Sequence, residues 1–137
     1  MTRLTRSYAF SAAHVLARPD WSDERNREVY GRCANPAGHG HNYVLEVTLR
    51  GEVTPSVGRL VPIDQLDRLV REKVLNRVDH RFLNRELAEF EQQVPTAENI
   101  ARFAWNALKG ETSPAVLDRV RLVETSNNSV VYCEEAK

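Results

Sequence analysis

The feature that most constrains the fold is a regular alternation of apolar and polar side chains in residues 42 to 53. The positions between the apolar ones are polar apart from Val44. Side chains of a β-strand point alternately to its two faces, so this run predicts a strand with one buried face. A less regular alternation in residues 4 to 10 predicts a partner strand that pairs with it as an antiparallel hairpin. The apolar face of the first run comprises Tyr43, Leu45, Val47 and Leu49.

The rest of the chain predicts two helices and then two more strands. Apolar residues at helical spacing predict one helix from about Ile63 to Arg77, with Asp64 as its cap. A second helix is expected to open at residues 95–96 and to end at Gly110. Residues 116–125 and 129–133 predict a closing pair of strands. The order β-β-α-α-β-β predicts an α+β fold, with two helices on one face of a four-stranded antiparallel sheet.

Between the first two strands lies a connection of residues 15 to 38, which is much longer than an ordinary loop. Long connections are usually functional or partly helical, and the charged stretch at residues 20–25 predicts a short helix there.

Composition limits the classes of function. The 137 residues suit one domain, 1–137, and Lys plus Arg balance Asp plus Glu at 19 each, so neither nucleic acid nor an anionic membrane is an expected partner. No apolar run approaches the roughly 20 residues that span a bilayer, and the start lacks the apolar stretch of a signal peptide. With only Cys33 and Cys133, a disulfide framework is not expected, and a cytoplasmic protein is predicted.

Three of the four histidines predict a metal site. His39 and His41 are two residues apart, so in a strand they lie on one face. Antiparallel pairing of the first two strands brings His14 beside them. Three neutral imidazoles suit Zn²⁺ and leave a fourth position open for water or substrate, as in catalytic zinc sites. The alternative is a His-x-His sequence that occurs in a turn by chance.

Cys33 lies in the bend before these histidines and has two interpretations. It can be a fourth ligand that closes a structural zinc site, or a thiolate beside the ion that acts as a base. Cys133 falls in the apolar pattern of the last predicted strand and is expected to be buried and inert.

Other polar residues also have two interpretations. Asp79 can orient the adjacent His80 and raise its basicity, or the two side chains can point apart. Glu124 either lies at an exposed strand end or, if buried, suits a ligand with two adjacent N–H donors. Thr96 is expected to be a helix N-cap.

Taken in order along the chain, these motifs resemble the 6-pyruvoyl-tetrahydropterin synthase family, which also contains the 6-carboxy-tetrahydropterin synthases of queuosine biosynthesis. The resemblance covers nearly the whole chain. The motifs that carry it are Phe10-Ser11-Ala12-Ala13-His14, the run Cys-Ala-Asn-Pro-Ala-Gly-His-Gly-His-Asn-Tyr from Cys33 to Tyr43, Asp79-His80, Pro95-Thr96-Ala97-Glu98-Asn99 and Val123-Glu124-Thr125.

The resemblance implies a role for each site residue. It implies zinc on His14, His39 and His41, and Cys33 as the catalytic base. It implies that Asp79 and His80 complete a proton-transfer group. It also implies that Glu124 anchors a pterin ring, with further contacts from the turn at Thr96, where Ala97 replaces a second threonine of some members.

The resemblance also implies an assembly. The family has the tunnelling fold (T-fold), in which three copies close their sheets into a barrel. Two trimers then stack into a homohexamer with active sites at subunit interfaces. Such closure removes the two open edges that a lone sheet exposes.

The implied substrate is 7,8-dihydroneopterin triphosphate. The pyruvoyl branch eliminates triphosphate, whereas the carboxy branch also splits the side chain and releases acetaldehyde. Five residues separate Cys33 from His39, which is typical of the pyruvoyl branch. A third branch carries glutamate in the role of the cysteine, and no glutamate lies in this interval. A non-catalytic zinc- or pterin-binding module is the alternative of another class. The basic candidates for the triphosphate are Arg18, Arg25, Arg27 and Arg32.

Overall fold

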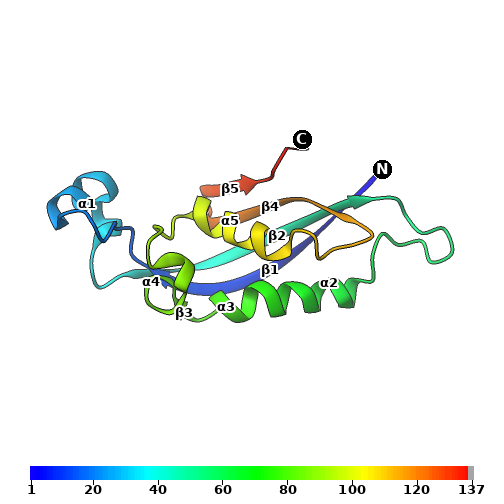
Figure 1. Cartoon of the computed structure of the whole chain (residues 1–137), viewed down its shortest axis with the longest axis horizontal. Helices are drawn as coiled ribbons and strands as arrows, with labels where there is room; N and C mark the ends of the chain where they lie inside the picture. Colours follow the sequence, from blue (N-terminus) through cyan, green and yellow to red (C-terminus); the bar gives the residue numbers. More distant parts are fainter. Residues whose placement is uncertain (136–137) are drawn as a thin grey trace.

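The computed structural model describes residues 1–135 and is built around one five-stranded sheet in the order β3-β1-β2-β4-β5 (Figure 1). The α+β class and the four predicted antiparallel strands are confirmed. The prediction of a purely four-stranded antiparallel sheet is wrong, because β3 adds a parallel strand beside β1. At two residues, β3 is too short to produce an alternating pattern. The strands are β1 (Thr2–His14), β2 (His39–Gly51), β3 (Arg81–Phe82), β4 (Val116–Thr125) and β5 (Asn128–Tyr132).

A long hairpin of β1 and β2 is the part of the sheet that positions the site. The two strands pair antiparallel from Thr2 opposite Gly51 to His14 opposite His39. Leu45 of β2 lies between Tyr8 of β1 and Leu122 of β4, so the three side chains share one face of the sheet. This is the face that the alternation predicts to be buried, and Leu45 is fully buried there.

The first predicted helix is continuous from residue 63 to residue 78, as α2 (Ile63–Val70), a π-helical turn η2 (Arg71–Leu75) and α3 (Asn76–Val78). Its extent confirms the prediction, but Asp64 as its cap is wrong. Pro62 occupies the N-cap position without a side-chain hydrogen bond, and Asp64 lies inside the first turn.

The second predicted helix is α5 (Ala97–Leu108). The side-chain oxygen of Thr96 accepts a hydrogen bond from the Asn99 backbone N–H at 3.2 Å, which confirms Thr96 as the N-cap. The backbone turns away at Gly110, whose φ of +80° favours glycine.

Both helices cover the same face of the sheet, as predicted. The core cluster joins helix residues to the buried face of β2, where each fully buried aliphatic side chain contributes about 1.5–3 kcal/mol. Helix residues in this cluster include Leu66, Val70, Val74, Ile100, Ala104 and Leu108.

The long connection between β1 and β2 contains α1 (Asp23–Tyr30) and a 3₁₀ turn η1 (Gly31–Ala34), which extend beyond the end of the sheet (Figure 1). The predicted short helix is therefore present, and Ser22 caps it by accepting from the Arg25 N–H. Two further elements were not predicted, α4 (Leu83–Glu86) and a 3₁₀ turn η3 (Ala88–Phe90). None of the helices in residues 1–135 has the length and apolarity needed to cross a membrane.

Candidate metal centre

The three histidines meet at the end of the β1–β2 hairpin. His14 is the last residue of β1 and lies opposite His39, the first residue of β2, while His41 lies opposite Ala12. Antiparallel partners project to the same face, so all three imidazoles emerge together. The predicted convergence of His14, His39 and His41 is confirmed.

The imidazole nitrogens are close enough to share one ion. The Nε2 atoms of His14 and His39 are 3.0 Å apart, and one ring nitrogen from each of the three histidines lies within 4.8 Å of the others. Two nitrogens at 2.0–2.1 Å from a tetrahedral zinc ion are separated by roughly 3.3 Å. The donor set therefore fits a three-histidine metal site.

A backbone carbonyl fixes the orientation of His14. Its Nδ1 lies 2.7 Å from the carbonyl oxygen of Pro95, and the Tyr43 hydroxyl lies 3.4 Å from the same nitrogen. A ring nitrogen that donates to a carbonyl leaves the other nitrogen unprotonated and free for a metal. His14 is 1% exposed, so its Nε2 is held in place by packing as well as by this hydrogen bond.

The surroundings favour neutral imidazoles. Burial lowers the pKa of His14, and the neighbouring His39 and His41 act in the same direction, against the Pro95 carbonyl and the Glu124 carboxylate. Burial also lowers the pKa of His39. Since only the unprotonated ring binds a metal, these shifts keep the site ready at neutral pH.

Cys33 does not join the three-histidine group. It is half-buried in η1, a free thiol whose backbone carbonyl accepts a hydrogen bond from the Leu16 N–H at 2.9 Å. Of its two interpretations, the geometry does not favour a fourth ligand. The expectation that Cys133 is buried is wrong: it lies just beyond β5 and is exposed, because Val130 and Tyr132 are the residues that pack against the core.

Asp79 and His80 interact with each other rather than pointing apart. The Asp79 carboxylate lies 2.9 Å from His80 Nδ1 and also accepts the Ser11 backbone N–H at 3.0 Å. Both hydrogen bonds lower the pKa of Asp79, and the one from the Ser11 N–H has the larger effect. The His80 backbone N–H donates to the Ser11 carbonyl, and His80 has a φ of 59°, which is uncommon outside glycine.

His80 is not a member of the histidine group, but it is near it. Its side chain is 82% exposed and lines an open hollow of about 500 Å³ together with His41, Ser11 and Asn42. One metal-ligand candidate and one proton-transfer candidate therefore border the same space within one chain.

Comparison with known proteins identifies this arrangement. Residues 3–135 match the sequence model of the family described as 6-pyruvoyl tetrahydropterin synthase. The chain belongs to this family. It is thus a member of an enzyme family that acts on pterins.

Relatives of the 6-pyruvoyl tetrahydropterin synthase family match the chain over nearly its full length. The human 6-pyruvoyl tetrahydrobiopterin synthase is 38% identical over 130 residues, which cover 95% of this chain and 90% of that protein. The solved structure of Caenorhabditis elegans 6-pyruvoyl tetrahydropterin synthase has a TM-score of 0.92 at 40% identity, and covers 98% of this chain and 96% of that one. The 6-carboxy-5,6,7,8-tetrahydropterin synthase of Haemophilus influenzae is 27% identical over 154 residues, covering 98% of this chain and all of that protein.

Glu124 lies on the histidine side of the sheet in this family member. It follows Val123 of β4, which pairs with Val44, so its side chain shares the face of Tyr43. It is half-buried, and its carboxylate accepts a hydrogen bond from the Asn128 side-chain amide at 3.2 Å. The carboxylate acts to raise the pKa of His14 and of His39, so it lies within electrostatic reach of the metal centre.

The Pro95 carbonyl and the side chains of Asn26 and Asn84 were not predicted from the sequence. A carbonyl acceptor has no side-chain signature, so no motif reveals it. Asn26 accepts a hydrogen bond from the Arg18 N–H and Asn84 accepts one from the Val15 N–H, both shortly after His14. The sequence signal that could have revealed them is an asparagine inside a short polar helical stretch.

Proposed function

We propose that this chain converts 7,8-dihydroneopterin triphosphate to 6-pyruvoyl-tetrahydropterin in a zinc-dependent reaction that releases triphosphate. The observation that carries the proposal is the convergence of three imidazole nitrogens within 4.8 Å. It is supported by the full-length similarity to proteins named 6-pyruvoyl tetrahydrobiopterin synthase.

Each polar residue has a role in this proposal. His14, His39 and His41 hold the Zn²⁺, which when bound polarises the side-chain hydroxyls of the substrate. Cys33 removes the proton from the adjacent carbon as a thiolate base.

Asp79 holds the His80 imidazole through the 2.9 Å contact, so that His80 can pass protons to and from the substrate. The Glu124 carboxylate binds adjacent N–H donors of the pterin ring, and the turn at Thr96 supplies further contacts to the pterin.

The 6-carboxy alternative is not favoured. Identity to the 6-carboxy relative is 27%, against 38% to the human 6-pyruvoyl relative, and the five-residue interval between Cys33 and His39 is typical of the pyruvoyl type.

The proposed assembly is a homohexamer of single-domain subunits, a dimer of trimers, in the cytoplasm. Among residues 1–135, β5 has a strand partner on one side only, and β3 covers just Ala12 and Ala13 of the outer edge of β1. Open edges of this length favour closure against neighbouring copies. A mass measured by light scattering at the monomer value would contradict this assembly.

Product identification tests the proposed reaction. Zinc-loaded protein is incubated with 7,8-dihydroneopterin triphosphate, and phosphorus NMR measures the triphosphate released while a coupled assay measures acetaldehyde. We expect triphosphate without acetaldehyde. Turnover with acetaldehyde would assign the 6-carboxy reaction, and no turnover would leave a binding module.

The base assignment has a matched control within the chain. Cys33→Ala is expected to lower kcat by at least about 100-fold, the usual contribution of a positioned base, while zinc content stays unchanged. Cys133→Ala removes the other thiol, which is exposed beyond β5, and should keep the parent rate. Equal rates in the two variants would contradict the role of Cys33.

A further inference from the structure

The only buried residue of α1 is polar. Asn26 is 6% exposed, whereas the other residues of this charged helix are exposed or half-buried. A helix that packs by the hydrophobic effect buries apolar side chains, so a lone buried amide indicates that this helix is held by hydrogen bonds.

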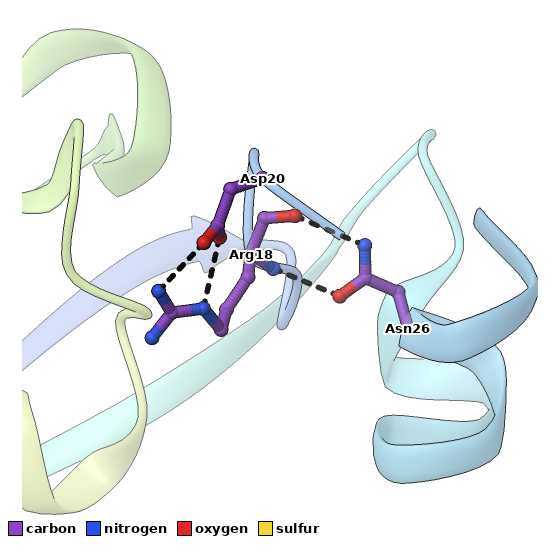
Figure 2. A network of polar contacts seen from close by, with 3 residues as sticks. All are labelled: Arg18, Asp20 and Asn26. Atoms are coloured by element: carbon purple, nitrogen blue, oxygen red, sulfur yellow. Dashed lines mark hydrogen bonds and ion pairs between the residues drawn. The ribbon is translucent and has the colours of Figure 1, made fainter. Parts of the chain in front are cut away.

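The Asn26 side chain pairs with the main chain of Arg18 at both of its polar atoms (Figure 2). The Arg18 N–H donates to Asn26 Oδ1 at 2.9 Å, and Asn26 Nδ2 donates to the Arg18 carbonyl at 3.1 Å. The Arg18 guanidinium turns away from this pairing and forms two hydrogen bonds with Asp20, at 2.9 and 3.0 Å. The backbone of Arg18 is therefore the anchor of the one buried residue of α1.

A second contact links the same two stretches of chain close by. The Leu16 N–H donates to the carbonyl of Cys33 at 2.9 Å. Cys33 belongs to η1, which follows α1 directly from Gly31. The Gly31 N–H donates a hydrogen bond to the Arg27 carbonyl and so caps the C-terminal end of α1. The segment 16–18 is thus hydrogen-bonded to the segment 26–33 at two places. One is the pairing of Arg18 with Asn26, and the other is the bond from Leu16 to Cys33 itself.

The same main chain begins at the metal centre. His14 is followed by Val15, and the Asn84 side chain pairs with Val15 in the same two-bond manner, at 2.8 and 2.9 Å. Two amides therefore hold the segment between His14 and Arg18: Asn84 from α4, and Asn26 from α1, which leads directly into the turn η1 that carries Cys33.

We propose that Asn26 is a positioning residue that fixes the Cys33 thiol relative to His14 by anchoring α1 and η1 to the main chain at Arg18. This inference rests on the proposed function, in which Cys33 acts as the base. Without the Asn26 pairing, the hydrogen bond from Leu16, the buried side chain of Ala34 and the stacking of Trp21 on Tyr30 are left to hold α1 and η1 in place. A small displacement of a reacting group can lower a rate by about 100-fold, so kcat is the quantity that Asn26 controls.

The test uses two substitutions that separate positioning from stability. Asn26→Leu fills the same space with apolar atoms but makes neither hydrogen bond, and Asn26→Asp keeps only the acceptor for the Arg18 N–H. With zinc-loaded protein, we expect kcat to fall by about 10- to 100-fold in Asn26→Leu and by less in Asn26→Asp, with KM and zinc content close to the parent values. Tm should fall by a few degrees, because the Arg18 N–H and carbonyl lose their partners, so kcat is measured well below Tm.

A second readout follows Cys33 itself and needs no substrate. In a Cys133→Ser background, the rate of alkylation by iodoacetamide reports how freely the half-buried Cys33 moves. We expect a several-fold faster rate in Asn26→Leu. Asn84→Ala is the matched comparison, because it removes the same kind of paired bonds from Val15 rather than from Arg18, and its alkylation should be accelerated clearly less than that of Asn26→Leu.

Each outcome decides the inference. Parent values of kcat and alkylation rate in Asn26→Leu would overturn it, as would equal acceleration of alkylation in Asn84→Ala. Loss of zinc together with kcat would also overturn it, because Asn26 would then act through the histidines. If the parent itself does not turn over the triphosphate substrate, the proposed reaction fails, while the alkylation rates still decide whether Asn26 holds Cys33.

Discussion

The imidazole of His14 and the backbone of Pro95 meet at 2.7 Å although they are 81 residues apart in the sequence. This contact ties the end of β1 to the turn that precedes α5, so the two halves of the chain must fold together before His14 is oriented. Because the carbonyl accepts a hydrogen bond from Nδ1–H, Nε2 faces His39, and the metal site depends on long-range packing.

Zinc should therefore stabilise the folded protein. Unfolding separates the three histidines, so at a free zinc concentration 100-fold above its Kd the free energy of unfolding should rise by about 2.7 kcal/mol. Thermal unfolding with zinc and with a chelator measures this difference. His39→Ala should abolish it, whereas His80→Ala, which lies outside the three-histidine group, should retain it. A full zinc shift in His39→Ala would contradict the assigned ligands.

Gly38→Ala should destabilise the protein more than Gly110→Ala. Both glycines have positive φ, +77° and +80°, so both substitutions carry the left-handed penalty of about 1–2 kcal/mol. A Cβ at Gly38 would also lie 2.8 Å from the Phe82 ring, whereas a Cβ at Gly110 meets nothing within 4 Å. Overpacking adds about 1–3 kcal/mol, which denaturant unfolding of the two variants measures as their difference.

Removing the ring at Phe82 tests the cause of that difference. In a Phe82→Ala background, Gly38→Ala should still carry the left-handed penalty and a tight contact of its Cβ with the His14 carbonyl oxygen at 3.3 Å, so most of its extra cost over Gly110→Ala should disappear. An unchanged difference would mean that the Phe82 contact is not responsible.

Glu124→Gln should raise KM for the pterin substrate while zinc content stays at the parent level. The amide replaces one acceptor oxygen with a donor, so it can no longer accept from two adjacent N–H groups of a ring. Steady-state kinetics and metal analysis measure the two quantities. Asn128→Ala is the control: it removes the side-chain partner of Glu124 but leaves the carboxylate, and should leave KM nearly unchanged. Equal KM in Glu124→Gln and the parent would exclude a pterin anchor at this position.

The sequence predicted the parts of the fold that repeat with a period. Alternation in β2 placed Leu45 and Val47 on the buried face, and antiparallel pairing of the first two strands predicted that His14 at the end of one lies beside His39 and His41 at the start of the other. Because one face is buried, a slip of one residue would turn every side chain over, so the structure holds the register that pairs His14 with His39.

Other parts leave no periodic signal. β3 has only two residues and forms by pairing with β1, not through a pattern of its own. Cys133 is a different case: the alternation of β5 does continue past Tyr132 and turns the thiol outward, but the residue was assigned from the apolar character of the run. The pairing of Asn26 with the Arg18 backbone depends on main-chain atoms that every residue carries. Such contacts require the folded structure.

Acid should weaken the fold partly through Asp67. The Arg6 guanidinium and the Tyr8 hydroxyl each donate a hydrogen bond of 2.8 Å to its carboxylate. These hydrogen bonds hold the pKa of Asp67 below its ordinary value, and the one from Arg6 has the largest effect. Because the pKa of Asp67 is lower in the folded state, its ionised carboxylate contributes fully to the free energy of unfolding above the unfolded-state pKa of about 3.9. This contribution is lost as the pH falls from that value through the folded-state pKa.

Asp67→Asn should therefore lower Tm by a few degrees at neutral pH, because it weakens the pairing with Arg6. The difference in Tm between this variant and the parent should become smaller as the pH falls below about 3.9. Thermal unfolding from neutral to strongly acidic pH measures both effects. Glu72→Gln serves as the control, since Glu72 is an exposed carboxylate of η2, and should follow the parent curve. A constant difference between Asp67→Asn and the parent across this range would show that protonation of Asp67 does not contribute to acid unfolding.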